Sequence, residues 1–388
     1  MIKVFRYRLY PTRKQEKTLH DTCFLCSILY NQALQERKDT YAKTGVGVSV
    51  YDQSKALPAL KKQDPRFKTA FSQVLMDVLG RLDKAYQNFF RRVKQGAGPQ
   101  GYPKFKSARY YDSFTYIQYG FKIIAHTKNG RLKLSKIGTI KTKFHRPIEE
   151  EIKTLTIKRR NGKWFACFAC EVQPKPLPKT GQVAGLDLGL EKYAVTSDGQ
   201  FFDNPRFYRK SEKKLACLQR EVSRKKKGSN RRKKAIARLG SLHEKVQNQR
   251  KDFLHKLTLT LLQQYDAIAI EDLKPNEMLS WPGINKSIYD ASWSMFSSIL
   301  WYKAEFLGHK VILVDPKNTS QQCCLCGNIV KKDLSIRVHD CPHCKLKVDR
   351  DLNAAINILH RSSLLGRNLF DQNTAGAAEI NAQGDFGL

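Results

Sequence analysis

Two short-spaced pairs of cysteines constrain the fold of this chain more than any other feature of its sequence. Cys323 and Cys326 form one Cys-x-x-Cys pair, and Cys341 and Cys344 form a second pair after fourteen intervening residues. Two such pairs can surround a single ion with a tetrahedron of four thiolates, which is the donor set of a structural zinc site. The chain must then fold back on itself between the pairs, and we expect one structural Zn²⁺ there.

Other cysteines must be weighed as ligands too. Cys324 lies inside the first pair and His343 inside the second, so the ligand set has alternatives, although the symmetric spacing favours the four cysteines. Two further pairs have the same spacing: Cys23 with Cys26, and Cys167 with Cys170. The first pair falls on an apolar helical face and is predicted to be core. The second lies in a predicted strand, where positions three apart point to opposite faces. We assign neither pair to a metal.

Positive charge is in large excess over the whole length. Lys and Arg number 70 against 35 Asp and Glu, a formal net charge of +35. A folded protein carries such a charge poorly without a polyanionic partner, and nucleic acid is the natural candidate. A merely soluble basic protein and an anionic membrane surface are the weaker alternatives. No apolar run approaches the roughly 20 residues that span a bilayer, and charges interrupt the N-terminus where a signal peptide is apolar, so we expect an intracellular protein.

The first part of the chain has the pattern of a strand followed by helices. Residues 1–10 alternate apolar and basic side chains with period two and stop before Pro11, which predicts a strand. Thr12 and Gln15 have the spacing of a capping box, and helical periodicity then continues to about Lys94. We therefore expect a helical subdomain after the first strand.

The next part has the pattern of a sheet. Aromatic and β-branched residues surround Asn-Gly pairs at 129–130 and 161–162, the strongest short-range signal for a hairpin. Residues 102–173 are therefore predicted to be mainly sheet, which the opening strand completes. The proline-rich segment 172–181 then reads as a linker.

The last part mixes strands and helices in the manner of an α/β or α+β domain. VAGLDLGL reads as an apolar strand, and KYAVTSDGQFF reads as a strand pair about an Asp-Gly turn. A long, very basic helical stretch follows from about Pro205 to Tyr265, and then the strand AIAIEDL, a helix from about Trp293 to Leu307 and the strand KVILVD. The tail after Leu365 is rich in Gly, Ala, Asn and Gln, and is predicted to be disordered.

Acidic residues lie in or at the ends of three predicted core elements. Asp187 interrupts an apolar strand, Glu271 ends another, and Asp349 and Asp351 open an alanine-rich helix directly after the cysteine pairs. An ionised side chain in an apolar strand is costly unless it is paired or holds a metal. A single acid at a strand end is more often an ordinary cap, but three in one domain indicate a site. Oxygen ligands without histidine favour Mg²⁺ or Mn²⁺, two of which can clamp a phosphodiester.

Other reaction classes have no support in the sequence. We find no Ser or Cys triad. GLDLG does not have the pattern of a phosphate-binding loop, and no GxxxxGK motif occurs in the sequence, so NTP hydrolysis is not indicated. Phosphodiester hydrolysis is the chemistry that agrees with both the acids and the basic charge.

Two basic segments are candidates for nucleic-acid contact. The run 211–239 contains only two acids and reads as a basic helical stretch suited to a phosphate backbone, although a solvated helix is the alternative. Its candidate residues are Lys225, Lys226, Lys227, Arg231 and Arg232. GYPKFKSARYY interleaves aromatic residues with Lys104 and Lys106, which suits base stacking combined with phosphate neutralisation. Core packing with exposed lysines explains the same aromatic residues about equally well.

Several motifs together resemble one family. They are RLYPTRKQE near the N-terminus, GLDLGLEKYAVTSDG, IAIEDLKPNEM, KSIYDASWSMF, and TSQQCCLCG with CPHCKLKVDRDLNAAINIL. These segments resemble TnpB, the transposon-encoded RNA-guided nuclease related to type V CRISPR effectors. The resemblance extends from the first strand to about Leu359, and its motifs are more specific after Gly181 than before it.

The resemblance implies an α+β multidomain fold. It consists of a wedge-type β-barrel with an inserted helical recognition lobe, and then a RuvC-like RNase H fold (α/β) split by a zinc ribbon. The expected ranges are 1–10 and 102–180 for the barrel, 11–101 for the lobe, 181–322 and 347–365 for the nuclease, 323–346 for the ribbon, and 366–388 for the tail. A cytoplasmic, nucleoid-associated location in a prokaryote is implied as well.

The resemblance also implies a site and a reaction. The family's acids correspond to Asp187, Glu271 and Asp351, which would hold two Mg²⁺ (or Mn²⁺) ions, with Asp187 bridging them. Asp351 is preferred to Asp349 because it directly precedes the x-Asn-Ala-Ala signature, which leaves Asp349 as a helix-start residue. Arg337, in the predicted ribbon, is hypothesised to steady the scissile phosphate.

The implied function is RNA-guided DNA cleavage. The partners would be a guide RNA drawn from the transposon end and a double-stranded DNA target, with no membrane. One rival is an RNA-guided DNA-binding repressor that has lost cleavage, which would be expected to lack one of the acids. Another is a transposase accessory that only holds nucleic-acid ends, which would need no acid triad. All three acids are present.

Overall fold

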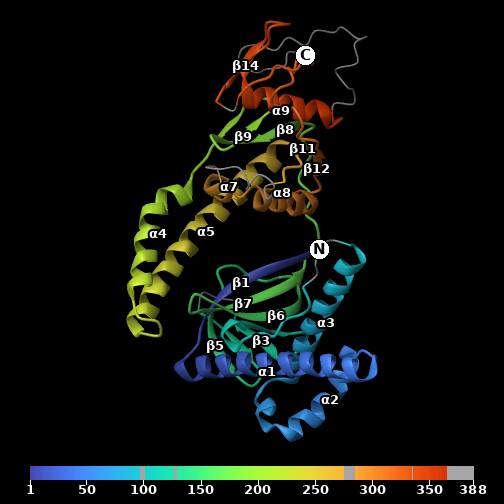
Figure 1. The fold of residues 1–388 in the computed structure, drawn as a ribbon, viewed down its shortest axis with the longest axis vertical. Coiled ribbons are helices and arrows are strands. Elements are labelled where there is room, and N and C mark those ends of the chain that lie inside the picture. Colours follow the sequence, from blue (N-terminus) through green and yellow to red (C-terminus); the bar gives the residue numbers. More distant parts are fainter. Residues whose placement is uncertain (97–100, 126–128, 275–284, 334, 365–388) are drawn as a thin grey trace. The chain divides into compact units, whose positions relative to one another are not determined.

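The computed structural model describes residues 1–96, 101–125, 129–274, 285–333 and 335–364. The chain divides into two compact units, Met1–Val172 (unit 1) and Gln173–Leu388 (unit 2) (Figure 1). The tail from residue 366, for which the sequence predicts disorder, lies outside the described residues. None of the helices in the described segments combines the length and the apolar character needed to cross a bilayer.

Unit 1 begins with a strand and three helices. They are β1 (Ile2–Tyr10), α1 (Arg13–Thr44), α2 (Val50–Gln63) and α3 (Ser72–Lys94), with a 3₁₀ turn at Pro65–Thr69 between α2 and α3. The predicted capping box is present at the start of α1, because the Thr12 hydroxyl accepts from the Gln15 N–H and the Gln15 side chain accepts from the Thr12 N–H. The helical stretch predicted to about Lys94 is confirmed.

A seven-stranded antiparallel sheet forms the rest of unit 1. Its order is β2-β6-β7-β1-β5-β4-β3, with β2 (Ser113–Tyr116), β3 (Phe121–Ala125), β4 (Gly130–Leu134), β5 (Gly138–Lys143), β6 (Glu151–Arg160) and β7 (Lys163–Glu171). The opening strand β1 completes this sheet between β7 and β5, as predicted. Among the described strands β2 and β3 each have one neighbour, so closure into a wedge-type barrel stays a prediction.

Both predicted hairpins of unit 1 are present. β6 and β7 pair across Asn161 and Gly162, whose φ angles of 48° and 71° are both positive, as a type I′ turn requires. β3 and β4 pair in the same antiparallel manner. The Asn-Gly signal therefore located the turns in this part of the chain.

The first residues predicted as sheet are not a strand. Residues 102–112 contain a 3₁₀ turn at Ala108–Tyr110, and β2 begins only at Ser113. The cause is local: the Lys106 carbonyl accepts from the Ser27 hydroxyl and the Asn31 amide, while the Lys106 N–H donates to the Asn31 side chain. Side chains of α1 thus occupy backbone groups that a strand would give to its neighbour.

Unit 2 is built on a five-stranded sheet of order β10-β9-β8-β11-β12. The strands are β8 (Val183–Leu188), β9 (Lys192–Thr196), β10 (Phe201–Asp203), β11 (Ala267–Glu271) and β12 (Lys310–Val314). β8, β11 and β12 are parallel, while β9 is antiparallel to β8 and to β10. These strands and the Asp-Gly turn between β9 and β10 confirm the order predicted from the sequence.

The helices of unit 2 are α4 (Phe207–Arg224), α5 (Asn230–Gln264), α7 (Asn285–Ala291), α8 (Trp293–Leu307) and α9 (Arg350–Arg361). Apolar side chains of α5 and α8 pack with those of β8 and β11 in one buried core that includes Leu186, Leu261, Ile270 and Phe296. α9 packs against β8, β9 and β11 (Figure 1). The chain therefore has a mixed α+β fold, as expected.

The basic stretch from about Pro205 to Tyr265 is helical, as predicted. It is divided into α4 and α5, which pack on each other, with a break at residues 225–229. Gly228 has a φ of +84°, a left-handed conformation that no helix interior accepts, and Ser229 then caps α5. The signal was present in the sequence as Gly228-Ser229.

Candidate functional site

Asp187 and Glu271 stand at the carboxyl ends of two neighbouring parallel strands. Leu186 of β8 pairs with Ile270 of β11, so that the two acids are the next residue on each strand. Between β8 and β11 the direction of the connections reverses, because β9 and β10 lie on one side of β8 and β11 and β12 on the other. In open α/β sheets, the crevice outside the carboxyl ends of the strands at such a switch point is where ligands bind.

Asp351 is brought to the same place by α9. Asp349 is the N-cap of this helix, and its Oδ1 accepts from the N–H groups of Asp351 and Leu352 at 2.8 and 3.1 Å. The prediction that Asp349 is a helix-start residue is therefore confirmed. A carboxylate that caps its own helix is committed to the backbone, whereas the Asp351 carboxylate is left to face the strand ends.

A glycine in β8 permits this approach of α9. A Cβ atom on Gly185 would lie 2.1 Å from the Ala355 carbonyl oxygen and 2.6 Å from the Leu359 nitrogen, so any larger residue at this position would push the helix backbone away. At Gly189, directly after β8, a Cβ atom would lie 3.8 Å from Asp351 Oδ2, which is an ordinary contact distance. Asp351 therefore lies beside the end of β8.

The charges of Glu271 and Asp351 both act on Asp187. Burial raises the pKa of Asp187 well above its ordinary value, and the charges of Glu271 and Asp351 raise it further. Burial also raises the pKa of Glu271, against the hydrogen bond from Thr319 and the charge of Arg361. For Asp351, burial and Asp349 raise the pKa, while Arg337 and Arg350 lower it. The charges of Glu271 and Asp351 disfavour ionised Asp187, so that a bound cation would relieve this repulsion.

Side chains that the sequence analysis missed hold these acids. The buried Thr319 hydroxyl donates to Glu271 Oε1, and the Asn357 amide of α9 donates to the Thr319 carbonyl at 2.8 Å. The Asn353 amide of the same helix donates to the Gln322 carbonyl at 2.7 Å. Asn353 and Asn357, four residues apart on one buried helix face, were the available signal for this contact.

Arg350 is a second residue that was missed. Its buried guanidinium donates to the carbonyls of Asp333 and Ile336 at 2.6 and 3.2 Å and to the Ser320 hydroxyl at 3.2 Å. It therefore ties the segment between the two cysteine pairs to the first turn of α9, directly next to Asp351.

Arg337 lies beside the carboxylate cluster, where its hypothesised role requires it. Its Nε is 2.8 Å from Glu191 Oε2, and its Nη1 is 3.9 Å from Asp351 Oδ1. Glu191 is a further acid at this edge that the sequence analysis did not single out. The guanidinium thus spans from the cysteine-rich segment to the end of β8.

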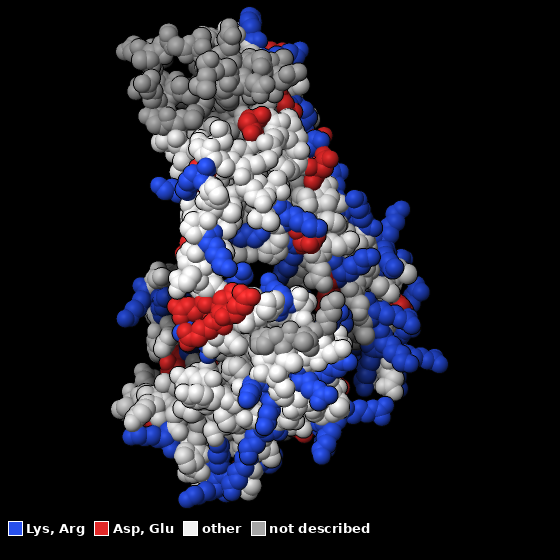
Figure 2. All heavy atoms as spheres, turned by 180° about the vertical axis from the view of Figure 1, so that it is seen from behind, with Lys and Arg blue, Asp and Glu red and all other residues white. Residues whose placement is uncertain are grey.

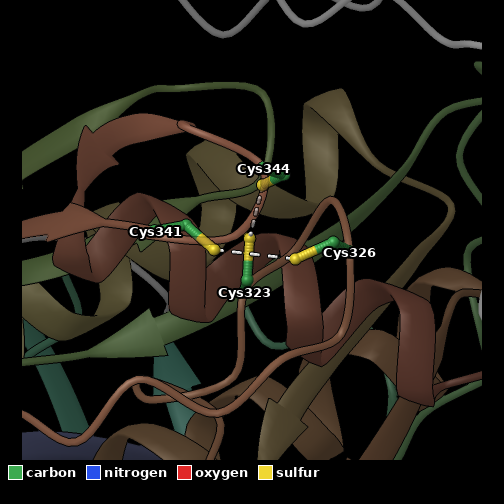
Figure 3. A group of neighbouring side chains, drawn as sticks. All are labelled: Cys323, Cys326, Cys341 and Cys344. Carbon is green, nitrogen blue, oxygen red and sulfur yellow. Dashed lines mark hydrogen bonds between the residues drawn. The ribbon is translucent and has the colours of Figure 1, made fainter.

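The four cysteines of the two spaced pairs converge on one point (Figure 3). Among the described residues they form the one group of candidate ligands whose atoms all lie within 4.8 Å of one another. The Sγ–Sγ distances are 3.6 Å for Cys323 with Cys344 and 3.6 Å for Cys326 with Cys341. Thiolates about 2.3 Å from a tetrahedral zinc lie about 3.8 Å from one another, so the cluster fits this ion closely.

The thiols of the cluster differ in their surroundings. Burial raises the pKa of Cys323 and of Cys344. Burial also disfavours the Cys341 thiolate, but backbone N–H groups of Cys344 and His343 and the thiols of Cys326 and Cys344 lower its pKa to about 7. Cys324 instead packs into a small apolar cluster with Leu352 and Ile356. Neither Cys324 nor His343 belongs to the four-residue group. The segment carries the short antiparallel pair β13 (Val338–Asp340) and β14 (Lys347–Asp349).

The remaining cysteine pairs lie as predicted. Cys23 and Cys26 are buried on the inner face of α1. Cys170 faces the core of the sheet, while Cys167 is on the opposite, more exposed face of β7. Among the described residues neither pair belongs to a group of metal ligands.

The basic candidates of unit 2 gather at one end of the α4–α5 hairpin. Lys225, Lys226 and Lys227 lie in the connection, and Arg231 and Arg232 in the first turn of α5. In Figure 2 Lys and Arg side chains are dense on the side of the molecule where α4 and α5 lie. Lys225 is 3.3 Å from Glu221, an ion pair of the exposed kind that contributes little.

The two lysine candidates of unit 1 differ in their surroundings. Lys104 is exposed. The Lys106 ammonium lies 4.3 Å from the centre of the Tyr30 ring, and burial together with Arg81 lowers the pKa of Lys106. Phe105 and Tyr110 are exposed beside them, as stacking surfaces would be. Lys106 is therefore already engaged in a cation–π contact.

Three family models match segments of the chain. Residues 167–281 match OrfB_IS605, described as "Probable transposase", and residues 293–358 match the "Cas12f1-like, TNB domain". Residues 1–45 match a model described as "Helix-turn-helix domain". In the structure these residues are β1 and the uninterrupted helix α1.

Similar proteins span nearly the whole chain. A protein of Streptomyces pristinaespiralis named "Putative RNA-guided DNA endonuclease" is 34% identical over 92% of this chain and 88% of its own length. "Putative RNA-guided DNA endonuclease InsQ" of Escherichia coli is 32% identical over 92% of both. The fold is similar to that in the cryo-EM structure of a Cas12f1-sgRNA-target DNA complex, with a TM-score of 0.61 over 92% of this chain and 98% of the other at 13% identity. The chain belongs to the TnpB family of transposon-associated proteins.

Proposed function

We propose that this chain is an RNA-guided DNA endonuclease that hydrolyses phosphodiester bonds at Asp187, Glu271 and Asp351 with bound Mg²⁺. The observation that carries the proposal is the meeting of three carboxylates from β8, β11 and α9, each with a raised pKa, outside the ends of parallel strands. The relatives named as RNA-guided DNA endonucleases support the guide RNA and the double-stranded DNA target as partners.

The nuclease fold is proposed to be RuvC-like. The mixed sheet of unit 2, with acids on its two central parallel strands and a third acid on the covering helix, supports an RNase H fold over 181–322 and 347–365. In unit 1, the insertion of α1, α2 and α3 between β1 and β2 supports a recognition lobe at 11–101 within a wedge-type barrel at 1–10 and 102–180. The ribbon at 323–346 would separate the two nuclease segments.

The residues fit the metal that the family implies. All three acids offer hard oxygen donors, and their mutual repulsion is the condition that a divalent cation relieves. Mg²⁺ bound there would supply the Lewis acidity and the activated water that phosphodiester hydrolysis needs.

The chain's own side chains have separate tasks in this mechanism. Thr319 orients the Glu271 carboxylate by its hydrogen bond, and Asp349 fixes the first turn of α9 so that Asp351 faces the strand ends. Arg337, now held by Glu191 and Asp351, would move to the phosphate that is cut. The four cysteines would hold one structural Zn²⁺, which would fix the backbone of the segment that carries Arg337.

Cleavage by the loaded protein tests the proposal. Purified protein with its copurified RNA is incubated with a plasmid library and Mg²⁺, beside the Asp187→Ala variant. We expect wild-type cleavage of a subset of plasmids and a loss of several orders of magnitude in the variant, because the ligands act as a unit. Guide and target binding should survive in the variant, since phosphate contacts come from Lys, Arg and backbone groups. Binding without cleavage by wild type would instead support the repressor alternative.

A further inference from the structure

A cavity of about 550 Å³ adjoins the carboxylate cluster within unit 2. It is lined by residues that follow β8, by the start of α4, by α7 and by the segment between the cysteine pairs, including Glu191, Arg206, Arg209, Ser287, Asp290 and Arg337. Its volume is within the range of about 300–1,000 Å³ that ligand pockets occupy. Arg337 links it to the acids, since this one guanidinium contacts both Glu191 and Asp351.

The lining of the cavity has an excess of positive charge. Three guanidinium groups, those of Arg206, Arg209 and Arg337, face two carboxylates. The Asp290 carboxylate is already neutralised, because Arg250 donates to its Oδ1 at 2.9 Å and the N–H groups of Tyr208 and Arg209 donate to it as well. Of the carboxylates that line the cavity, only Glu191 remains to offset the three guanidinium groups, while Glu212, outside the lining, is shared between Arg209 and Lys286. The lining is therefore suited to an anion.

The contacts that now hold Arg206 and Arg209 are few and long. Arg206 Nη2 is 3.4 Å from the Leu190 carbonyl oxygen. Arg209 donates to Glu212 at 3.3 Å and to the Ser287 hydroxyl at 3.1 Å, and the other Glu212 oxygen accepts from Lys286 at 2.6 Å. Exposed contacts of this length contribute little to stability and are easily exchanged. Charge-assisted bonds from arginine to a phosphate are shorter and stronger.

Hydrogen bonds to a buried carboxylate fix the backbone at the start of α4. Asp290, buried in α7, accepts from the first N–H groups of α4 and binds Arg250 of α5. Arg206 directly precedes the helix with a φ of 48°, a left-handed conformation that is costly for a residue other than glycine. Strain retained beside a charged cavity is typical of a functional site.

We propose that this cavity binds the phosphodiester that neighbours the scissile one in the target DNA strand, through Arg206 and Arg209. The inference rests on the proposed nuclease function. A strand that presents one phosphate to Asp351 must place the next phosphate nearby, and Arg337 bridges the two positions. Arg206 and Arg209 are then positioning residues that align the strand, whereas the acids act on the bond itself.

A double variant with a matched control tests the assignment. Arg206→Gln with Arg209→Gln removes two positive charges from the cavity. Lys245→Gln with Lys310→Gln removes two from exposed positions of the same unit outside it. Under single-turnover conditions with saturating RNA-loaded protein and Mg²⁺, we expect the cavity variant to cleave roughly ten- to a hundredfold more slowly. The control should stay within about twofold of wild type, and target affinity should change little in either.

Neutral linkages in the DNA test the ligand directly. Methylphosphonates, which lack the phosphate charge, are placed one at a time on either side of the cut. We expect one neighbouring linkage to slow wild type about as much as the double variant does, and to slow the double variant no further, because both changes remove the same contact. Equal slowing of both proteins at every position, or a cavity variant as fast as the control, would overturn the proposal.

A readout without cleavage separates this inference from the proposed function. Phenylglyoxal labelling of arginine, followed by mass spectrometry, is compared with and without guided target DNA. Protection of Arg206 and Arg209 in a protein that does not cleave would support the cavity and contradict the nuclease. Equal labelling in both samples would contradict the cavity, whatever the activity. Protection by the guide RNA alone would assign the anion to RNA and overturn the assignment to the target strand.

Discussion

At the residue scale, the three acids are costly to the fold that carries them. Asp187 is flanked by Leu186 and Leu188 in a strand that packs into the core, and Glu271 and Asp351 add their charge to the same crevice. The raised pKa of each acid means that the folded, metal-free protein would be more stable with these groups neutral. Such a cost persists where function requires it.

Asp187→Asn should therefore stabilise the protein in magnesium-free buffer. The ionised form of Asp187 is disfavoured in the fold, so wild-type stability declines as pH rises from about 3.9, the ordinary pKa of Asp, and levels off above the raised pKa. The variant lacks this decline. Its Tm should exceed that of wild type by a few degrees at pH 8 and by less at pH 5, since each kcal/mol is worth about 2–4 °C in a domain of this size. Scanning fluorimetry at several pH values, with zinc retained, measures the difference.

The direction with pH is the critical part of that result. A variant that is less stable than wild type at every pH, or an advantage that shrinks as pH rises, would mean that the Asp187 charge is compensated in the fold. Addition of Mg²⁺ should narrow the advantage, because the ion stabilises only the protein that binds it.

Thr319→Val should weaken the use of Mg²⁺ without disturbing the zinc site. Valine keeps the branched shape of threonine but removes the hydroxyl that donates to Glu271. Loss of such an outer contact typically costs 10–100-fold in metal affinity or activity. We expect the Mg²⁺ concentration for half-maximal cleavage to rise about tenfold, measured by titration with loaded protein.

Thr319→Ser is the matched control, since serine retains the hydroxyl. It should stay near the wild-type Mg²⁺ requirement, and both variants should bind target and contain zinc as wild type does. A valine variant that needs no more Mg²⁺ than the serine variant would remove Thr319 from any role in positioning Glu271.

At the element scale, the packing of α9 on β8 places the third acid. Gly185→Ala would set a Cβ atom 2.1 Å from the Ala355 carbonyl, and backbone cannot move aside as a flexible side chain can. We expect a loss of about 1–3 kcal/mol or more and a fall in cleavage, measured by denaturant unfolding and by activity. Gly47→Ala, where a Cβ atom meets nothing within 4 Å, should change stability by no more than about 0.5 kcal/mol. A tolerated Gly185→Ala would contradict the close approach of α9.

Zinc binding by the cysteine-rich segment should be needed both for the folding of this segment and for DNA cleavage. Cys326→Ser or Cys344→Ser removes one of four thiolates, so zinc content should fall from about one per chain towards zero and the segment should unfold. Because Arg350 and Asn353 join this segment to α9, cleavage should fall too. Elemental analysis and the plasmid assay measure both. Cys217→Ser, at an exposed cysteine outside the cluster, should retain zinc and activity. Zinc that persists unchanged in both ligand variants would refute the assignment.

At the scale of the whole molecule, the charge of +35 predicts copurification with RNA and binding that weakens steeply with salt. Replacing Lys225, Lys226, Lys227, Arg231 and Arg232 together by Gln should lower affinity and flatten the dependence of log K on log salt. Each lost phosphate contact is worth about 0.7–0.9 in that slope, so a decrease of up to about 4 is expected. Filter binding across a salt series measures it. If neither affinity nor slope changes, the end of the hairpin is only solvated.

Local patterns in the sequence predicted those features that depend on neighbouring residues. Period-two alternation located β1, the capping box located the start of α1, and Asn161-Gly162 located a hairpin. The x-x spacing identified the four clustered cysteines, because a knuckle is a local structure. The distinction between Asp349 and Asp351 came from the resemblance to the family, and the helix cap that Asp349 forms agrees with it. The break between α4 and α5 also has a local signal, since Gly228 adopts a positive φ and Ser229 caps α5.

Tertiary structure decided what depends on distant segments. Nothing in the spacing of Thr319 and Glu271 indicates their hydrogen bond, and residues 102–112 lost their predicted strand to side chains of α1. The cavity is lined both by Arg206, which directly precedes α4, and by Arg337 of the cysteine-rich segment. Such contacts leave no periodicity, because they arise when elements pack through the shape and volume of their faces. The three acids could therefore be predicted as a site from the sequence, whereas the side chains that contact them became visible only once β8, β11 and α9 were packed together.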